Sequence, residues 1–358
     1  MNVLTERASV VYNRDSVNTN TVIRARSPLR ISFVGGGTDL AHYYEECGGA
    51  VLSSTINRYA FATLRPRQDA TVRITALDFG HSAEYQLQDK SVHNDGLFDL
   101  VRTAIRRVGG DKGFELDLHG EAPRGSGLGG SSAVTAAILG AMIEYLGAVL
   151  DSYELAELNY QIERIDLGIA GGKQDQYATT FGGFNLIEFS KDRVDVTPLR
   201  LPVDALNDLE DHLTLYYTGQ VRPLLGIVEK RIAAYESGDS FVHDGMRRLH
   251  SMVYDAKDAL LKGRMREFGA LLHESMVNKK KLDPNVSTPY IDELYELARN
   301  SGAVGGKLLG AGGGGYLLLF VEGRRQFEVR AKLEKAGAVY THFSFEDRGL
   351  QVWRSRCF

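Results

Sequence analysis

Cysteine is scarce in this chain of 358 residues: it occurs only at Cys47 and Cys357, far apart in the sequence. Two such distant thiols make no disulfide framework, so a reducing cytoplasm is the expected compartment. No apolar run approaches the length of a membrane-spanning helix, and the N-terminus has no apolar signal core, so no contact with a membrane is expected. Basic residues are not in excess, because the formal net charge is -4. Nucleic-acid-binding proteins are normally basic, so no nucleic-acid partner is expected.

What remains is the composition of an ordinary globular protein, with 43% hydrophobic and 25% charged residues. The length suits two domains or one large one. Residues 1–20 are polar and lack periodicity, so we expect a flexible extension there. A charged stretch with two prolines at residues 191–212 indicates a boundary. We therefore expect an N-terminal domain at residues 21–200 and a C-terminal domain at residues 201–358.

Alternating and periodic apolar patterns indicate both strands and helices, which follow no strict strand–helix–strand order and therefore predict the α+β class. Strands are expected at residues 21–26, 50–65, 71–79, 114–121, 184–189, 213–217, 316–321, 339–345 and 350–353. Helices are expected at residues 97–108, 131–146, 151–165 and 325–335, and long helical patterns run up to about residue 300.

The most informative segment is rich in glycine. Residues 123–133 read Pro-Arg-Gly-Ser-Gly-Leu-Gly-Gly-Ser-Ser-Ala and lead directly into an apolar helical pattern. Free backbone N–H groups at a helix start, together with the positive end of the helix dipole, favour phosphate. Small side chains let the backbone approach a ligand closely. The segment therefore predicts a loop that binds the phosphates of a nucleotide.

Two commoner phosphate loops fit this segment less well. Gly125, Gly127 and Gly130 have the spacing of the dinucleotide-binding fingerprint, and Asp151 lies near the position of its ribose-binding acid. However, the preceding strand at residues 114–119 alternates apolar and polar residues, whereas the first strand of that fold is apolar throughout.

Asp151 also fits a different role, because Glu154 follows it by three residues ahead of an apolar pattern, as in a helix capping box. A Walker A loop needs a lysine after its last glycine, and Ser131 stands there instead. Both alternatives are disfavoured, and a dinucleotide-dependent oxidoreductase remains only a distant alternative.

Two further motifs accompany the phosphate loop. Residues 28–39 read Pro-Leu-Arg-Ile-Ser-Phe-Val-Gly-Gly-Gly-Thr-Asp, so that Arg30 and Asp39 enclose a turn of three glycines. By itself this motif fits a tight turn with a surface ion pair. Residues 305–315 are again rich in glycine and lead into an apolar strand. Such a stretch loses much conformational freedom on folding, so it indicates a place where backbones pass closely or a ligand binds.

Together and in this order, the three motifs resemble those of the GHMP kinase family, named for galactokinase, homoserine kinase, mevalonate kinase and phosphomevalonate kinase. The pattern Pro-x-x-x-Gly-Leu-x-x-Ser occurs here at residues 123–131. The resemblance implies ATP-dependent phosphorylation of a small molecule. It also implies an N-terminal α/β domain of the ribosomal-protein-S5-like type and a C-terminal ferredoxin-like domain, with the active site between them.

Five segments resemble the heptose kinase branch of that family more specifically, namely residues 29–39, 48–53, 171–177, 181–185 and 305–315. Enzymes of that branch phosphorylate D-glycero-D-manno-heptose 7-phosphate at the anomeric hydroxyl, and the 1,7-bisphosphate feeds synthesis of surface polysaccharide (capsule, LPS or S-layer). The resemblance thus implies a small sugar phosphate as substrate, and a homodimer is the expected assembly. Two alternatives stay open: a fucokinase- or galactokinase-like enzyme, and a protein that senses nucleotide and sugar without turnover.

The resemblance also assigns the parts of a nucleotide site. It implies contacts to ATP from Pro123, Gly125, Ser126, Gly127, Leu128, Gly129, Gly130, Ser131 and Ser132. Ser131 and Glu163 match the positions that bind Mg²⁺, a cation that takes few protein oxygens and keeps several waters. Without the resemblance, Glu163 would be interpreted as an exposed carboxylate on a helix.

Asp175 matches the catalytic aspartate of the family, and Arg30 matches the arginine of the first motif. Phosphoryl transfer depends mainly on positioning and charge neutralisation. The pair is therefore expected to orient the attacking hydroxyl, draw charge from its oxygen and accept its proton late. Asp39 is expected to hydrogen-bond sugar hydroxyls, although it could instead cap the helix that follows it.

Substrate binding is expected from Gly36, Gly37, Thr38, Asp39, Gly172, Lys173, Arg222, Gly312 and Gly313. A sugar phosphate also needs a cation, because charge-assisted contacts to phosphate are strong. Lys173, Arg222 and the run Lys279–Lys281 are candidates, and the sequence does not choose between them. For the lysine run, exposure to solvent is the favoured interpretation.

Overall fold

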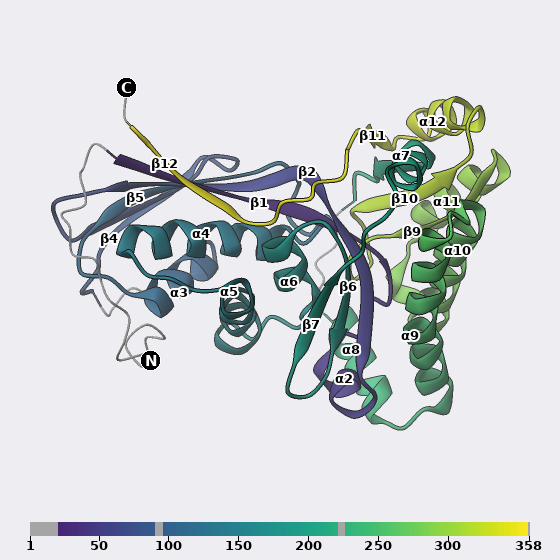
Figure 1. Ribbon diagram of the computed structural model, residues 1–358, viewed down its shortest axis with the longest axis horizontal. Coiled ribbons are helices and arrows are strands. Elements are labelled where there is room, and N and C mark those ends of the chain that lie inside the picture. The colour runs from purple at the N-terminus through teal and green to yellow at the C-terminus, as the bar shows by residue number, and fades with distance from the viewer. Residues whose placement is uncertain (1–20, 90–95, 221–225, 357–358) are drawn as a thin grey trace.

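The computed structural model describes residues 21–89, 96–220 and 226–356. Its strands are β1 (Thr21–Val34), β2 (Gly49–Pro66), β3 (Thr71–Ala76), β4 (His81–Gln86), β5 (Phe114–Gly120), β6 (Phe184–Phe189), β7 (Val194–Pro198), β8 (Leu213–Tyr217), β9 (Ala303–Leu308), β10 (Tyr316–Val321), β11 (Val339–Thr341) and β12 (Gln351–Arg356). Within these residues they form one sheet of eight strands and one of four, separated along the long axis of the molecule (Figure 1).

The helices are α2 (Ala41–Cys47), α3 (Asp99–Val108), α4 (Gly130–Leu146), α5 (Ser152–Tyr160), α6 (Gln174–Phe181), α7 (Val203–His212), α8 (Ile227–Glu236), α9 (Ser240–Leu261), α10 (Met265–Leu282), α11 (Pro289–Asn300) and α12 (Arg325–Lys335). A π-helical segment, η1 (Gln161–Asp166), continues α5, and a 3₁₀ turn, η2 (Pro284–Val286), follows α10. None of the described helices combines the length and the apolar character that crossing a bilayer requires. Helices and antiparallel strands are mixed without strict alternation, which confirms the α+β class.

The larger sheet is built around β1 and β2, which pair antiparallel along most of their length. The first part of β2 pairs with β6 and its last part with β5, so this one strand belongs to both arms of the sheet. The ladder between β1 and β2 is irregular at Pro28/Leu29, immediately before Arg30. Such irregularities re-aim side chains, and here the change of register precedes the arginine of the first motif.

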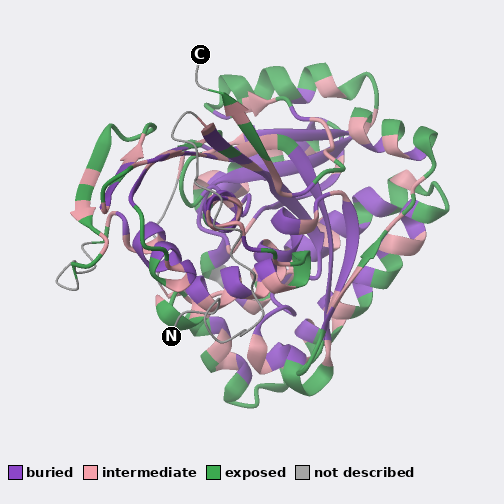
Figure 2. Cartoon of the chain, turned by 60° about the vertical axis from the view of Figure 1, so that its left-hand side comes forward, coloured by how far each residue is buried: buried purple, intermediate pink, exposed green. Residues whose placement is uncertain are grey.

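Helix α4 lies against the larger sheet, where it contacts β1 and β2. Its sequence is apolar on every side, as expected of a helix buried all round, and most of its residues are buried. Figure 1 shows α4 running along the sheet, and Figure 2 shows buried residues concentrated on strands and inward helix faces. The phosphate loop therefore precedes a rigidly packed helix.

The two sheets share one hydrophobic core, which joins residues of β1, β2, α9 and α10. Phe33 of β1 stacks on Phe184 of β6 with ring centroids 5.4 Å apart, and it meets Phe268 of α10 edge-on at 5.5 Å. Because β1 carries Arg30 and the first glycine turn, this packing holds residues of the chain's second half beside the first motif.

The end of the chain departs from the expected division at residue 200. The strand predicted at residues 350–353 corresponds to β12, which pairs antiparallel with β1 in the larger sheet. The last residues of the chain therefore belong to the same sheet as the first strand. Gly140 of α4 has no side chain where Leu350 and Val352 pack against it. Local patterns do not reveal such a long-range pairing. The expected extension at residues 1–20 lies outside the described residues.

Several local predictions are confirmed and several need correction. Asp151 and Glu154 form the predicted capping box at the start of α5. The helix expected at residues 151–165 changes to a π-helix after Tyr160, and the strand expected at residues 339–345 ends at Thr341. Strands β4 and β7 were not predicted, because their exposed and mixed sequences carry no strong apolar alternation.

Candidate active site

The predicted phosphate loop lies between β5 and α4, and α4 begins at Gly130. Gly125, Gly127 and Gly129 have φ angles of 70°, 84° and 73°, a region that side-chain-bearing residues rarely adopt. No side chain caps α4, so the N–H groups of its first turn are left for another partner. The loop therefore has the backbone geometry that an anion site requires.

The third glycine motif packs directly against this loop. A Cβ atom on Gly127 would overlap the Leu309 carbonyl, and one on Gly310 would overlap Gly127. Tyr316 N donates a 3.1 Å hydrogen bond to the Ser126 carbonyl. The expectation that backbones pass closely at residues 305–315 is confirmed. Within the same motif, Gly313 N donates to the Val286 carbonyl at 2.8 Å, and Gly312 also packs on Val286.

Arg30 and Asp175 form the predicted pair. Arg30 donates from Nε to Asp175 Oδ1 at 2.8 Å, and its Nη2 lies 2.6 Å from the same oxygen. Its third nitrogen, Nη1, donates to the Gly127 carbonyl at 2.5 Å, so one buried guanidinium ties Asp175 to the phosphate loop. The carboxylate stands in the first turn of α6 and is partly exposed. Among the described residues, Asp175 Oδ2 accepts no hydrogen bond and is available to a ligand.

Asp39 lies next to this pair and is 2% exposed. Its Oδ1 accepts from Gly37 N at 2.9 Å, and its Oδ2 accepts from Gln174 N at 3.2 Å. Burial raises the pKa of Asp39, the Gly37 N–H opposes that shift, and the Asp175 carboxylate adds to it. The helix-cap alternative is wrong, because Leu40 is the N-cap of α2 and no side chain caps that helix.

The neighbouring residues predicted to bind substrate differ in what their positions allow. Gly172 packs so closely on the Asp39 carboxylate that a Cβ atom would overlap it. The Thr38 hydroxyl donates to the Gly35 and Ala50 carbonyls, at 2.9 and 2.8 Å. Thr38 therefore holds the glycine turn together and has no hydroxyl proton left for a sugar. Gly36 and Gly37 belong to the same turn.

Glu163, from η1, is completely buried, so the alternative of a surface carboxylate is wrong. Ser132 Oγ donates to Glu163 Oε2 at 2.6 Å, and the Gln176 amide donates to the same oxygen. The other oxygen, Oε1, is buried without a hydrogen-bond partner in the described structure. Ser131, predicted as the metal-binding hydroxyl, is exposed, whereas the adjacent Ser132 donates to Glu163.

A carboxylate oxygen without a partner, next to a hydroxyl at the start of α4, suits Mg²⁺, which prefers oxygen ligands. No group of three or more histidine, cysteine, aspartate or glutamate side chains is placed to hold a metal ion in the part of the chain that the structure describes. Mg²⁺ commonly takes one or two protein oxygens and completes its shell with phosphate oxygens and water. Ser132 and Glu163 fit that pattern.

The predicted phosphate-binding cations differ in their burial and in their contacts. Lys173 Nζ lies 3.2 Å from Glu157 Oε2 and 4.6 Å from the centre of the Tyr160 ring, so its charge is already engaged. Arg222 lies outside the described residues. In the lysine run, Lys281 is exposed as expected, whereas exposure is wrong for Lys279, which is buried.

Two buried cations near these residues were not predicted as site residues from the sequence, namely Arg231 of α8 and Lys307 of β9. Lys307 Nζ donates to the Phe33 carbonyl at 2.9 Å, and Arg231 Nη1 approaches Gly37. Burial, followed by the charges of Arg30 and Arg231, lowers the pKa of Lys307 to about 7. The position of Lys307 within a glycine motif could have indicated a role. Arg231 stands in a helix with no distinctive pattern.

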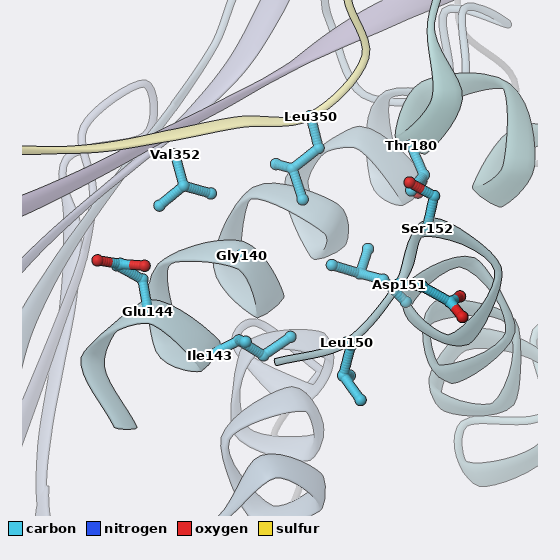
Figure 3. A pocket seen from close by; sticks show the side chains of 10 residues that line it. Gly140, Ile143, Glu144, Leu150, Asp151, Ser152, Thr180, Leu350 and Val352 are labelled. Atoms are coloured by element: carbon cyan, nitrogen blue, oxygen red, sulfur yellow. The ribbon is translucent and has the colours of Figure 1, made fainter. Parts of the chain in front are cut away.

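A separate hollow of about 230 Å³ lies between α4, α5 and the segment before β12 (Figure 3). Ile143, Leu150 and Leu350 line it together with polar residues at the start of α5. It contains none of the residues predicted for the nucleotide, the metal or the substrate, so it lies apart from the chemistry described above.

Residues 97–183 match the N-terminal domain of GHMP kinases, and residues 256–339 match the C-terminal region of GHMP kinases. A D-glycero-alpha-D-manno-heptose 7-phosphate kinase from Campylobacter jejuni is 36% identical over 341 residues, which cover 93% of this chain and 99% of that protein.

Two crystal structures resemble the fold closely. A D-glycero-D-manno-heptose 1-phosphate kinase from Bacteroides thetaiotaomicron gives a TM-score of 0.77 at 34% identity, covering 92% of this chain and 98% of that one. Lactococcus lactis galactokinase in complex with galactose gives a TM-score of 0.76, covering 92% and 95%. Its identity is 22%, so this second likeness concerns the fold alone.

Proposed function

The chain belongs to the GHMP kinase family, and from that premise we propose that it transfers the γ-phosphoryl group of ATP to a hydroxyl of a D-glycero-D-manno-heptose phosphate. One observation carries this proposal: Arg30 bonds both Asp175 and the Gly127 carbonyl, so a carboxylate with a free oxygen lies beside the phosphate loop. The names of two relatives above 30% identity support a heptose phosphate as the acceptor class.

The acceptor hydroxyl is the finer part of the proposal. One relative is named for a heptose 7-phosphate and the other for a heptose 1-phosphate. We take the 7-phosphate as substrate, following the relative that is 36% identical over nearly the whole chain. The acceptor is then the anomeric hydroxyl and the product is the 1,7-bisphosphate, which would serve surface polysaccharide synthesis. A cytoplasmic location, where ATP is made available, and a homodimeric assembly belong to the same proposal.

The described side chains suit this transfer. The substrate hydroxyl hydrogen-bonds Asp175 Oδ2, and its oxygen attacks the γ-phosphorus of ATP. The bond from that phosphorus to the β,γ-bridging oxygen breaks, ADP leaves, and the hydroxyl proton passes to the Asp175 carboxylate. Because two nitrogens of Arg30 hold Oδ1, the carboxylate keeps its orientation during the transfer.

Three further groups assist this arrangement. The uncapped first turn of α4 offers N–H groups to the nucleotide phosphates. We expect Asp39, which Gly37 N and Gln174 N hold, to bind sugar hydroxyls beside Asp175. Ser132 and Glu163 would hold Mg²⁺, which neutralises charge on the transferring phosphates when bound.

The proposal is tested by measuring ADP formation with a panel of acceptors: heptose 7-phosphate, the unphosphorylated heptose, galactose and fucose. We expect the highest kcat/KM with the heptose phosphate, because its remote phosphate contributes binding energy that aligns the reacting hydroxyl. Loss of one or two charge-assisted hydrogen bonds corresponds to roughly ten- to ten-thousand-fold in kcat/KM. An equal or higher kcat/KM with galactose or fucose would overturn the heptose assignment and leave the kinase assignment intact.

A further inference from the structure

A connected series of contacts leads from the phosphate loop to a buried group of cations. Arg30 joins the loop to Asp175. Gln174, the residue before Asp175 in the sequence, donates its backbone N–H to Asp39. Asp39 in turn accepts from Gly37 N. Arg231 lies against Gly37, because a Cβ atom on that glycine would be 3.1 Å from Arg231 Nη1. The series thus leads from the nucleotide loop through the expected sugar position to Arg231.

Arg231 is 6% exposed, and its Nε and Nη2 groups are buried without a hydrogen-bond partner in the described structure. A buried guanidinium with unsatisfied donors is strongly unfavourable unless an anion completes its surroundings. Asp39 and Asp283 are the carboxylates whose charges act on it. Neither lies within ion-pair distance of Arg231 among the described residues, so two donors remain for a ligand.

Lys279 and Lys307 stand in the same electrostatic environment. Each donates to a backbone carbonyl, Lys279 to Gly310 and Lys307 to Phe33, and neither forms an ion pair with a described residue. Burial lowers the pKa of Lys279 well below its usual range, and the charge of Lys307 is the next largest cause. Such mutual repulsion among buried cations is relieved when a multiply charged anion binds between them.

The balance of charge points the same way. Four buried cations meet here: Arg30, Arg231, Lys279 and Lys307. The carboxylates acting on them are Asp39, Asp175 and Asp283, and Arg30 already holds Asp175. Burial also raises the pKa of Asp39, which weakens its contribution of negative charge. With both lysines charged, the group would carry more positive charge than the described carboxylates neutralise, and a bound anion would stabilise that charged state.

We propose that Arg231, Lys279 and Lys307 bind the phosphate group that the sugar substrate already carries, and that Arg231 makes the enzyme selective for phosphorylated sugars. This assignment rests on the proposed function, because it takes the substrate to be a sugar phosphate. The transferring phosphates belong to the glycine loop, and Asp175 and Asp39 lie between that loop and Arg231 in the series of contacts. Lys279 lies nearer to the loop, because it donates to Gly310, which packs on Gly127. A planar guanidinium with two free donors suits two oxygens of a phosphate monoester.

The decisive quantity is the ratio of kcat/KM for heptose 7-phosphate to kcat/KM for the unphosphorylated heptose. Arg231→Met removes the two unpartnered donors, so we expect this ratio to fall by about ten- to a hundredfold. Arg231→Lys keeps a point charge and is expected to restore part of the ratio. The matched control is Lys230→Met, which removes an exposed cation one residue away on α8 and should leave the ratio at the wild-type value.

Binding of inorganic phosphate provides a second readout that does not depend on turnover. We expect calorimetry without ATP to show phosphate binding to the wild type and to Lys230→Met, and weaker binding to Arg231→Met. Thermal unfolding of each variant identifies any general loss of folding. If Arg231→Met folds poorly, the kcat/KM ratio and the phosphate affinity of Lys307→Met test the assignment instead. An unchanged ratio in a folded variant, or an equal fall for both sugars, overturns the assignment.

The two hypotheses fail in different ways. If the wild type phosphorylates heptose 7-phosphate and Arg231→Met is as selective for it as the wild type, the proposed function stands and the phosphate subsite at Arg231 is wrong. If the wild type does not phosphorylate heptose 7-phosphate, but binds inorganic phosphate and Arg231→Met does not, the proposed substrate is wrong and the phosphate subsite stands.

Discussion

Ser132 Oγ donates a 2.6 Å hydrogen bond to Glu163 Oε2, and both side chains are completely buried. This contact joins the first turn of α4 to η1, 31 residues further along the chain. It leaves Glu163 Oε1 without a partner in the described structure, beside the place where nucleotide phosphates are expected. We therefore propose that this pair would hold Mg²⁺.

Replacement of adjacent serines tests that position. Ser132→Ala removes the donor to a buried carboxylate, a hydrogen bond to a charged group worth about 1.5–3 kcal/mol. We expect the Mg²⁺ concentration for half-maximal ADP formation to rise by about tenfold or more in Ser132→Ala. Ser131 is exposed, and the hydrogen bond to Glu163 comes from Ser132, so Ser131→Ala should raise this Mg²⁺ concentration less than Ser132→Ala does. Superimposable Mg²⁺ titrations of Ser132→Ala and wild type would contradict the metal assignment.

Asp175→Asn tests the proton acceptor. Asparagine keeps an oxygen that can accept from Arg30, so the fold and the orientation of the side chain should persist. The variant loses the carboxylate that takes the hydroxyl proton, and we expect kcat to fall by roughly 10²- to 10⁴-fold while ATP binding persists. The matched control is Asp166→Asn, because Asp166 also pairs with an arginine, Arg107, but lies in η1 at the surface. Near-full turnover by Asp175→Asn would remove Asp175 from this role.

The close packing of the glycine motifs predicts different stabilities for two neighbouring alanine variants. Gly127 has a φ of 84° and no room for a Cβ atom beside Leu309, so Gly127→Ala should lower the free energy of unfolding by more than about 1 kcal/mol. Gly130 begins α4, and nothing lies within 4 Å of the position that a Cβ atom would take there, so Gly130→Ala should be neutral or stabilising. Urea denaturation of both variants measures the difference, and equal stabilities would show that the two motifs do not pack as described.

The lowered pKa of Lys307 predicts that binding of a sugar phosphate is coupled to proton uptake. Lys307 has a pKa of about 7 in the free protein. Burial lowers this pKa most, the charges of Arg30 and Arg231 lower it further toward that value, and Asp39 opposes them. The charge of Lys279 also repels that of Lys307. At pH 8 it is mostly neutral, and a phosphate dianion favours its charged form, so binding takes up a proton. Affinity should therefore fall as pH rises above about 7.

Calorimetry at pH 8 in buffers of different ionisation enthalpy measures this uptake directly. We expect uptake for the wild type, less uptake for Lys307→Met, and the wild-type value for Lys281→Met, which removes an exposed lysine of α10. An observed heat that does not vary with the buffer would show that Lys307 does not change its protonation when the sugar phosphate binds.

Local sequence patterns predicted those elements whose own residues carry the signal. Strands at residues 184–189, 213–217 and 316–321 have the predicted bounds, because each is a short, mainly apolar segment that ends at polar or glycine residues. The return of β12 to β1 could not be predicted, because pairing between Thr21 and Arg356 depends on the whole fold rather than on either segment.

The site was predictable where glycine and charge occur together in one motif. Such motifs carried the resemblance to the family, which assigned roles to Arg30 and Asp175, and the structure brings these two residues and Asp39 together. Arg231 was missed because an isolated arginine on a helix has the same pattern whether it faces solvent or a buried ligand site. Ser131 and Ser132 are adjacent and chemically identical, so only the packing of α4 on η1 distinguishes the buried hydroxyl from the exposed one.

We propose that this protein phosphorylates the anomeric hydroxyl of heptose 7-phosphate with ATP. Phosphorus NMR of the reaction products tests it most directly, because it identifies the atom that receives the phosphoryl group. We predict that wild-type enzyme with ATP, Mg²⁺ and heptose 7-phosphate yields ADP and a second sugar phosphate resonance coupled to the anomeric proton, and that Asp175→Asn yields neither within the same time. A new resonance coupled to a different sugar proton, or ADP formed without any new sugar phosphate, would contradict the account.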